Sequence, residues 1–252
     1  FKSVRAGFGG RLKKIVCGGA PVRKELGDFF DAVGITLING YGITECSPLV
    51  SANRDYYNDC TTVGVPLPCA EIKIEDKTEE GIGEICVRGP IVMLGYYKNE
   101  AATEEVLNDG WFATGDYGML DDEGRIVITG RKKNIIVLKN GKNIYPEEIE
   151  AHLEPLPLVS EVAVYAEFDE NGDETGLCAE IFPDAAAVKE QGIADIKKSL
   201  TEEIKKACEK LPGYKHISKI VVRDKEFEKT TSKKIKRNGL GGKHTEGNTD
   251  NA

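Results

Sequence analysis

Apolar and polar positions near the N-terminus alternate in blocks that indicate two strands and a helix. Residues 14–17 (Lys-Ile-Val-Cys) form a short apolar run, residues 22–33 have helical spacing, and residues 35–38 form a second apolar run. Strand, glycine turn, helix and strand is the pattern of a parallel α/β unit, whose functional loops gather at the carboxyl ends of its strands. The residues expected at those two ends are Gly18, Gly19, Ala20, Pro21, Asn39, Gly40, Tyr41 and Gly42.

The pattern changes between Val63 and Val127, where short strands alternate with close turn signals. The clearest strands are residues 70–74, 83–88 and 125–128, with glycine-containing turns between them. This spacing predicts an antiparallel, barrel-like piece.

A second change comes at Gly130. A helix is expected at residues 146–153, strands at 161–166 and 178–182, and then a longer amphipathic helix. Six apolar residues recur at three- and four-residue spacing in that helix: Ile193, Ile196, Leu200, Ile204, Ala207 and Leu211. We therefore expect one domain over residues 1–130, a small α+β domain over 131–240 and a disordered tail over 241–252, in a fold of class α/β plus α+β.

Composition excludes several classes of function. The 252 residues are 40% hydrophobic and 30% charged with a net charge of -8, which argues against a nucleic-acid binder. No apolar run approaches the roughly 20 residues that cross a bilayer. The seven cysteines are odd in number and form no Cys-x-x-Cys pair, so we expect neither a disulfide framework nor a zinc site. These features indicate a cytoplasmic protein, with peripheral membrane contact left open.

Four short segments carry candidate chemistry. Taken singly, each has a plain interpretation: a glycine-rich loop with a surface Glu, an Asp in a turn, a solvated basic turn, and a basic localisation or phosphate-binding stretch. The segments are Tyr41-Gly42-Ile43-Thr44-Glu45, Thr114-Gly115-Asp116, Gly130-Arg131-Lys132-Lys133 and Lys229 to Arg237. Together, in this order and at these separations, they resemble the adenylate-forming enzymes: acyl-CoA synthetases, luciferases and the adenylation domains of peptide synthetases.

The resemblance implies a nucleotide site in a large adenylation domain. It implies that Tyr41 packs on adenine, that the Thr44 hydroxyl reaches the α-phosphate of ATP, and that Glu45 holds Mg²⁺, which prefers hard oxygen ligands. Asp116 would accept both ribose hydroxyls with its paired oxygens. The residues named above at the two strand ends would also contact the nucleotide.

The resemblance also implies a mobile C-terminal lid. Arg131 would touch the nucleotide, Ile128 would pack against the adenine, and Lys133 would be the pivot of the lid. Gly141, in a segment typical of acyl-CoA synthetases, would leave room for the pantetheine arm of CoA.

Lys234 matches the lysine that bridges the carboxylate and the α-phosphate during adenylation, a role suited to a compact cation on a flexible stem. Two residues depart from the family's pattern. Glu228 stands where Pro is usual, and Lys233 stands where Gly is usual. Lys233 is therefore a rival for the catalytic role.

The chain begins at Phe1 and contains no Ser/Thr/Gly-rich phosphate loop. We therefore expect the C-terminal half of a long- or medium-chain fatty acyl-CoA synthetase, inactive without its N-terminal half. The implied partners are a carboxylic acid, ATP (released as AMP), Mg²⁺ and CoA. An acyl–acyl carrier protein ligase and a non-catalytic nucleotide-binding module remain as alternatives.

Overall fold

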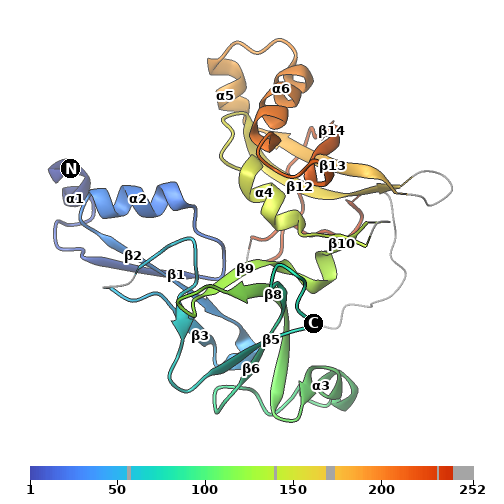
Figure 1. Ribbon diagram of the computed structural model, residues 1–252. Coiled ribbons are helices and arrows are strands. Elements are labelled where there is room, and N and C mark those ends of the chain that lie inside the picture. The colour runs from blue at the N-terminus through green and yellow to red at the C-terminus, as the bar shows by residue number, and fades with distance from the viewer. Residues whose placement is uncertain (56–57, 139–140, 169–173, 232, 241–252) are drawn as a thin grey trace. The chain divides into compact units, whose positions relative to one another are not determined.

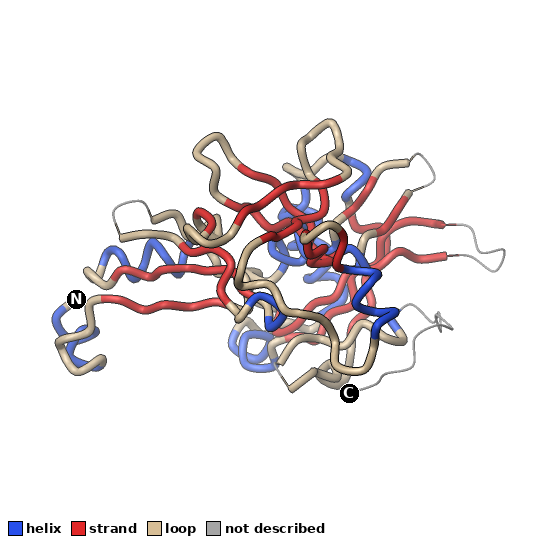
Figure 2. The backbone as a smooth tube through the Cα atoms, turned by 90° about the horizontal axis from the view of Figure 1, so that it is seen from below, coloured by secondary structure: helices blue, strands red, loops and turns tan. Residues whose placement is uncertain are grey.

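The computed structural model describes residues 1–55, 58–138, 141–168, 174–231 and 233–240; the others are drawn in grey in Figures 1 and 2. The tail expected at 241–252 lies outside the described residues. The chain divides into two compact units, the first ending at Lys133 and the second starting at Asn134. The boundary predicted from the sequence, after residue 130, lies slightly earlier. No described helix is both long enough and apolar enough to span a membrane.

The first unit opens with a small mixed sheet of order β1-β2-β3-β4. Strands β1 and β2 are parallel, with helix α2 packed along β2, so the predicted α/β unit is confirmed. The other two strand pairs are antiparallel. The elements are α1 (Lys2–Gly7), β1 (Lys14–Gly18), α2 (Lys24–Ala32), β2 (Thr36–Gly42), η1 (Thr44–Cys46), β3 (Leu49–Ala52) and β4 (Val65–Pro66).

The second strand is longer than the apolar run predicts. Residues 39–42, expected in a loop after the strand, lie inside β2, and Gly40, Tyr41 and Gly42 pair with β3. The expectation of a loop there is wrong because β3 returns alongside and satisfies the backbone groups of these polar and glycine residues. Glycine is needed where β1 and β2 approach closely: a Cβ on Gly18 would stand 2.9 Å from the carbonyl oxygen of Gly40.

A five-stranded antiparallel sheet follows, of order β5-β6-β8-β7 with β9 paired to β8. The predicted antiparallel character is confirmed. Strand β8 contains Thr114, Gly115 and Asp116, so these residues are not in a loop or turn. Buried Tyr41 and Val50 of the first sheet pack with Ile85, Phe112 and Ile126 of the second, which joins both sheets into one core. The elements are β5 (Glu71–Glu75), β6 (Gly83–Arg88), α3 (Glu100–Val106), β7 (Leu107–Asn108), β8 (Trp111–Leu120), β9 (Ile126–Arg131) and η2 (Lys132–Asn134).

The second unit is a three-stranded sheet covered by helices α4 and α6 (Figure 1). Strands β12 and β13 are antiparallel, whereas β13 and β14 are parallel. The elements are β10 (Ile136–Val137), β11 (Asn143–Ile144), α4 (Pro146–Leu153), β12 (Val159–Phe168), β13 (Glu174–Pro183), α5 (Ala185–Glu190), α6 (Ile196–Cys208), η3 (Gly213–Lys215) and β14 (Ile217–Val222).

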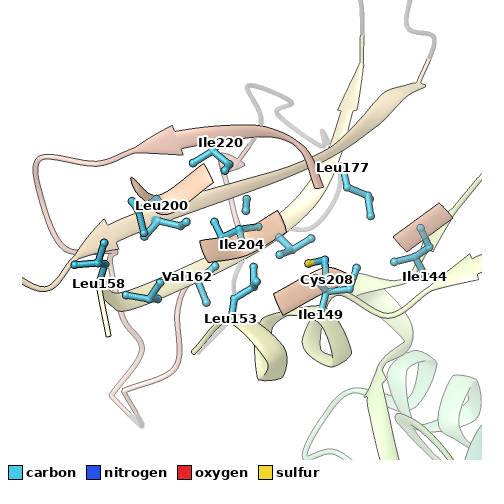
Figure 3. Packing of buried hydrophobic residues seen from close by; sticks show 14 residues of the cluster. Ile144, Ile149, Leu153, Leu158, Val162, Leu177, Leu200, Ile204, Cys208 and Ile220 are labelled. Atoms are coloured by element: carbon cyan, nitrogen blue, oxygen red, sulfur yellow. The ribbon is translucent and has the colours of Figure 1, made fainter. Parts of the chain in front are cut away.

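Helix α6 confirms the amphipathic pattern but is shorter than the apolar spacing predicts. Its buried residues Leu200, Ile204 and Cys208 recur every four positions and point into the core, together with Ile149 and Leu153 of α4 (Figure 3). The helix starts only at Ile196 because the Asp195 side chain accepts a hydrogen bond from the Lys198 amide, which caps the N-terminus there.

Candidate nucleotide site

In the first unit, residues from two other segments of the chain, Tyr41 and Arg131, contact the carboxylate of Asp116. The Tyr41 hydroxyl donates to Oδ2 of Asp116 at 2.7 Å, and Arg131 forms a salt bridge in which its Nε lies 2.8 Å from Oδ1. The strand register explains the meeting, because Asp116 of β8 lies directly opposite Arg131 of β9. The structure thus brings together the residues assigned by sequence to adenine, ribose and nucleotide contact.

The Asp116 carboxylate is almost fully buried, with 4% of the residue exposed. A buried charge needs a charged or hydrogen-bonded partner, and Arg131 and Tyr41 supply both kinds. Burial, and then the charge of Asp116, raises the pKa of Tyr41 well above its ordinary value, so the phenol stays protonated and donates. Only 6% of Tyr41 is exposed, so its ring presents little surface to a base in this structure.

A second buried carboxylate, missed by sequence reasoning, lies on β6. Glu84 accepts a hydrogen bond from the Gly115 amide at 3.1 Å through Oε1, and from Nζ of Lys132 at 2.5 Å through Oε2. The hydrogen bond that Lys132 donates to Glu84 raises the pKa of Lys132, although partial burial of the amine opposes this. A signal was present in the sequence: Glu84 is a charge next to the buried run Ile85-Cys86-Val87.

Thr44 and Glu45 follow β2 in the single-turn helix η1. In the described part of the chain the Thr44 side chain shows no hydrogen bond, which leaves its hydroxyl available to a ligand. Glu45 is fixed twice: Oε1 accepts from the Tyr96 hydroxyl at 3.0 Å, and its backbone oxygen accepts from the Met93 amide at 2.8 Å. Tyr96 is the second residue that sequence reasoning missed as part of the site.

The donor set around Glu45 suits Mg²⁺ only in part. No group of three or more His, Cys, Asp or Glu side chains able to hold a metal occurs among the described residues. Mg²⁺ is commonly bound by one or two carboxylates together with substrate phosphates. Glu45 therefore fits a magnesium ion that arrives with ATP rather than one held by the protein alone.

The ends of the parallel strands lie side by side, since Gly18 pairs with Gly40. The predicted loop that starts at Gly18 and continues through Gly19, Ala20 and Pro21 is exposed. Asn39 is buried, and its Oδ1 has no hydrogen-bond partner among the described residues. Such an unpaired acceptor suits a donor such as the amino group of a base.

Two further predicted residues lie on β9 and just after it. Ile128 is 38% exposed, so an apolar face is available for packing against a base. Lys133 is exposed and lies in η2 at the division between the two units.

In the second unit, Lys234 lies in a short hairpin closed by backbone pairing of Lys229 with Ile235. The Thr230 amide donates to the Lys234 oxygen at 2.8 Å, and the Lys234 side chain is exposed. Lys233, which replaces the usual Gly, has a φ of +62°. This left-handed conformation explains the family's preference for Gly at this position.

The far end of the same segment is anchored to helix α4. Nη2 of Arg237 donates to Oε2 of Glu150 at 2.6 Å, and Oε1 of Glu150 accepts from the Val164 amide at 2.6 Å. Burial raises the pKa of Glu150, and the Arg237 charge opposes part of the rise. Gly141 closes the β10–β11 turn with a φ of +78°, and a Cβ built on it meets open space.

Two protein families match the chain, one within the first unit and the other over the second. The AMP-binding enzyme family matches residues 2–97, and the AMP-binding enzyme C-terminal domain matches residues 133–245. The long-chain-fatty-acid–CoA ligase FadD15 of Mycobacterium bovis is 43% identical over 166 residues, which cover 65% of this chain and 26% of that protein. The long-chain-fatty-acid–CoA ligase of Escherichia coli O157:H7 is 39% identical over 236 residues, covering 88% of this chain and 39% of that protein.

Solved structures that resemble this chain include those of a CoA synthetase. The o-succinylbenzoate CoA synthetase MenE of Bacillus subtilis, solved with its acyl-adenylate intermediate, is 28% identical, with a TM-score of 0.78 over 95% of this chain and 49% of that one. The same enzyme with ATP and magnesium ion gives a TM-score of 0.77. The chain thus spans about half the length of this synthetase and less than half the length of the curated ligases. It belongs to the family of AMP-binding, adenylate-forming enzymes.

Proposed function

We propose that the complete protein carrying this chain activates a fatty acid with ATP and transfers the acyl group to CoA. The observation that carries the proposal is the convergence of Tyr41 and Arg131 on the buried carboxylate of Asp116. The long-chain-fatty-acid–CoA ligases among the relatives support a fatty acid as the substrate.

The reaction has two steps. The carboxylate of the fatty acid attacks the α-phosphorus of ATP, and the bond to pyrophosphate breaks, which gives an acyl adenylate. The thiol of CoA then attacks the acyl carbonyl, and AMP leaves. Both steps gather negative charge at the α-phosphate, so the site must place cations and hydrogen-bond donors there.

Asp116 is suited to bind the ribose. Its two carboxylate oxygens are acceptors that lie side by side, which suits a pair of ribose hydroxyls, and the contacts with Tyr41 and Arg131 hold the carboxylate in place. The Arg131 side chain is 43% exposed, so its guanidinium could also donate to oxygens of the nucleotide. The Thr44 hydroxyl would donate to the α-phosphate.

Magnesium bound by Glu45 and the phosphates would supply neutralising charge. Tyr96 keeps the Glu45 carboxylate in place by donating to one of its oxygens. In our proposal the second unit, which starts at Asn134, acts as a lid that turns at Lys133, brings Lys234 to the α-phosphate for the first step, and presents the turn at Gly141 to the pantetheine arm for the second.

The test is palmitate-dependent exchange of pyrophosphate into ATP, together with CoA-dependent release of AMP, by the complete protein. Lys234→Ala should lower exchange about a hundredfold or more, the usual effect of removing one transition-state donor. Lys236→Ala, the loss of a neighbouring exposed cation, should leave exchange unchanged. Exchange that survives Lys234→Ala but is lost with Lys233→Ala would assign the role to Lys233.

Other outcomes would change the proposal itself. Acyl-adenylate formation without a CoA thioester would indicate another thiol acceptor, such as a carrier protein. Absence of exchange with any fatty acid, alongside intact nucleotide binding, would refute the ligase function and favour a binding module.

A further inference from the structure

Two buried carboxylates hold the last residues of the first unit. Asp116 pairs with Arg131, and Glu84 pairs with the next residue, Lys132. The following residue, Lys133, is exposed, and the structure shows no ion pair or side-chain hydrogen bond for it among the described residues. The chain is therefore restrained by charge up to Lys132, and the restraint ends one residue before the division between the units.

The two ion pairs are formed by residues of three neighbouring strands, in the order β6-β8-β9, and by the residue that follows β9. Glu84 of β6 is opposite Tyr117 of β8, while the neighbouring Asp116 is opposite Arg131 of β9. Only 6% of Glu84 is exposed, whereas 58% of the Lys132 side chain is exposed. The rigid partner is thus the carboxylate in the sheet, and the lysine of the connecting segment is drawn to it.

Glu84 also contacts the backbone next to Asp116. Its Oε1 accepts from the Gly115 amide, next to Asp116, while its Oε2 accepts from Lys132. A buried carboxylate that loses one of these partners carries an uncompensated charge. Movement of Lys132 is therefore transmitted to the backbone beside Asp116.

We propose that Glu84 is a positioning residue that fixes the connecting segment through Lys132, so that rotation between the units begins at Lys133, and that holds the Gly115 backbone beside Asp116. The part about rotation rests on the proposed function; the restraint itself is a property of the first unit alone. Glu84 acts through Lys132 and Gly115, without touching a substrate.

Limited digestion with trypsin tests the restraint without any ligand or activity. The bond after Lys133 is a tryptic site, and its cleavage requires the segment around it to open. Glu84→Gln should speed cleavage after Lys133 roughly fivefold, since it weakens a hydrogen bond between charged groups and cleavage follows the population of the open form. Glu80→Gln, which removes an equal charge from an exposed turn of the same unit, should leave the rate unchanged.

A second variant guards against misfolding of the first. Lys132→Met breaks the same ion pair from the exposed side and should give a similar acceleration after Lys133. The double variant Glu84→Gln/Lys132→Met should be cleaved after Lys133 no faster than either single variant, because each substitution already breaks the Glu84–Lys132 ion pair. Equal cleavage in the wild type, Glu84→Gln and Lys132→Met would overturn the proposal, as would additive effects of the two substitutions.

Kinetics of the complete protein separate a positioning role from a merely structural one. Lys132→Met should lower kcat several-fold with little change in KM for ATP, since it frees only the connecting segment. Glu84→Gln should also raise KM for ATP several-fold, since it loosens Gly115 as well. A uniform loss of active protein with unchanged kinetic constants in both variants would contradict the positioning role. The tryptic result stands whether or not the proposed ligase function holds.

Discussion

Arg131 and Asp116 face each other across neighbouring antiparallel strands, with the guanidinium Nε 2.8 Å from the carboxylate Oδ1. The pair joins two segments that the sequence marks separately, one around Thr114 and the other around Lys132. The Asp116 carboxylate is buried, whereas the Arg131 guanidinium is partly exposed. The ion pair therefore holds the positive charge of Arg131 beside a buried acceptor.

Tyr41→Phe removes only the hydroxyl that donates to Asp116. The variant should lose about 2 kcal/mol of unfolding free energy, the usual range for a hydrogen bond to a charged group. Urea unfolding followed by the fluorescence of Trp111, the only tryptophan of the chain and part of the same unit, measures the change. Tyr97→Phe, at an 88% exposed position, is the matched control and should be neutral. Equal stability of Tyr41→Phe and wild type would show that the hydrogen bond does not stabilise the unit.

Tyr96→Phe frees the Glu45 carboxylate from its hydrogen bond. If Glu45 binds magnesium with the phosphates of ATP, a less ordered carboxylate should raise the Mg²⁺ concentration for half-maximal activity about three- to tenfold. Magnesium titration of pyrophosphate exchange by the complete protein measures this, again with Tyr97→Phe as control. An unchanged Mg²⁺ requirement would argue that Tyr96 has no part in metal binding.

The periodicity of the sequence predicts the parallel β1–α2–β2 unit, the antiparallel sheet and helices α4 and α6, because each depends on local apolar spacing. It does not predict where β2 ends, since residues 39–42 become a strand only when β3 pairs with them. Strand β8 was missed for a related reason: Gly115 and Asp116 interrupt its apolar pattern, and the strand forms by pairing on both sides.

Sequence motifs named Asp116 and Arg131, and the structure shows that these two residues contact each other. Glu84 and Tyr96 could not be assigned in the same way, because their roles arise from contacts with residues 31 and 51 positions away in the sequence. A buried Glu at the edge of an apolar strand was the one local signal. The roles of Lys133, Gly141 and Lys234 remain predictions from the family resemblance.

Arg237→Met tests how the Lys234 hairpin is anchored, through its dependence on pH. Burial already raises the pKa of Glu150 above its ordinary 4.5, and loss of the Arg237 charge should raise it further. A carboxyl whose pKa is higher in the folded chain binds more protons when folded, so stability falls as the pH rises from 4.5 through the folded pKa. The variant should therefore be nearly as stable as the wild type at pH 5 and roughly 2 kcal/mol less stable at pH 8.

Urea unfolding at both pH values, followed by circular dichroism, measures this difference. Lys236→Met removes a neighbouring exposed charge and should show no such dependence on pH. A loss of stability in Arg237→Met that is the same at pH 5 and pH 8 would show that the pKa of Glu150 is not coupled to Arg237.

Lys233→Gly should stabilise the second unit by about 1 kcal/mol, because a side chain in the left-handed region is strained and glycine is not. Lys233→Ala is the matched control: it removes the same charge but keeps the Cβ, so it should give no gain. Thermal unfolding of the three proteins distinguishes strain from charge. A gain in Lys233→Ala equal to that in Lys233→Gly would assign the effect to charge.

The central claim is that the Asp116 carboxylate binds the ribose of an adenosine site in the first unit. Calorimetric titration of the chain with a non-hydrolysable acyl-adenylate analogue tests it most directly, with Asp116→Asn beside Asp122→Asn, an exposed Asp in a neighbouring turn. The account predicts binding by the wild type and by Asp122→Asn, and at least about tenfold weaker binding by Asp116→Asn, since the amide offers one acceptor and no charge. Equal affinity of all three proteins, or no binding by the wild type, would contradict it.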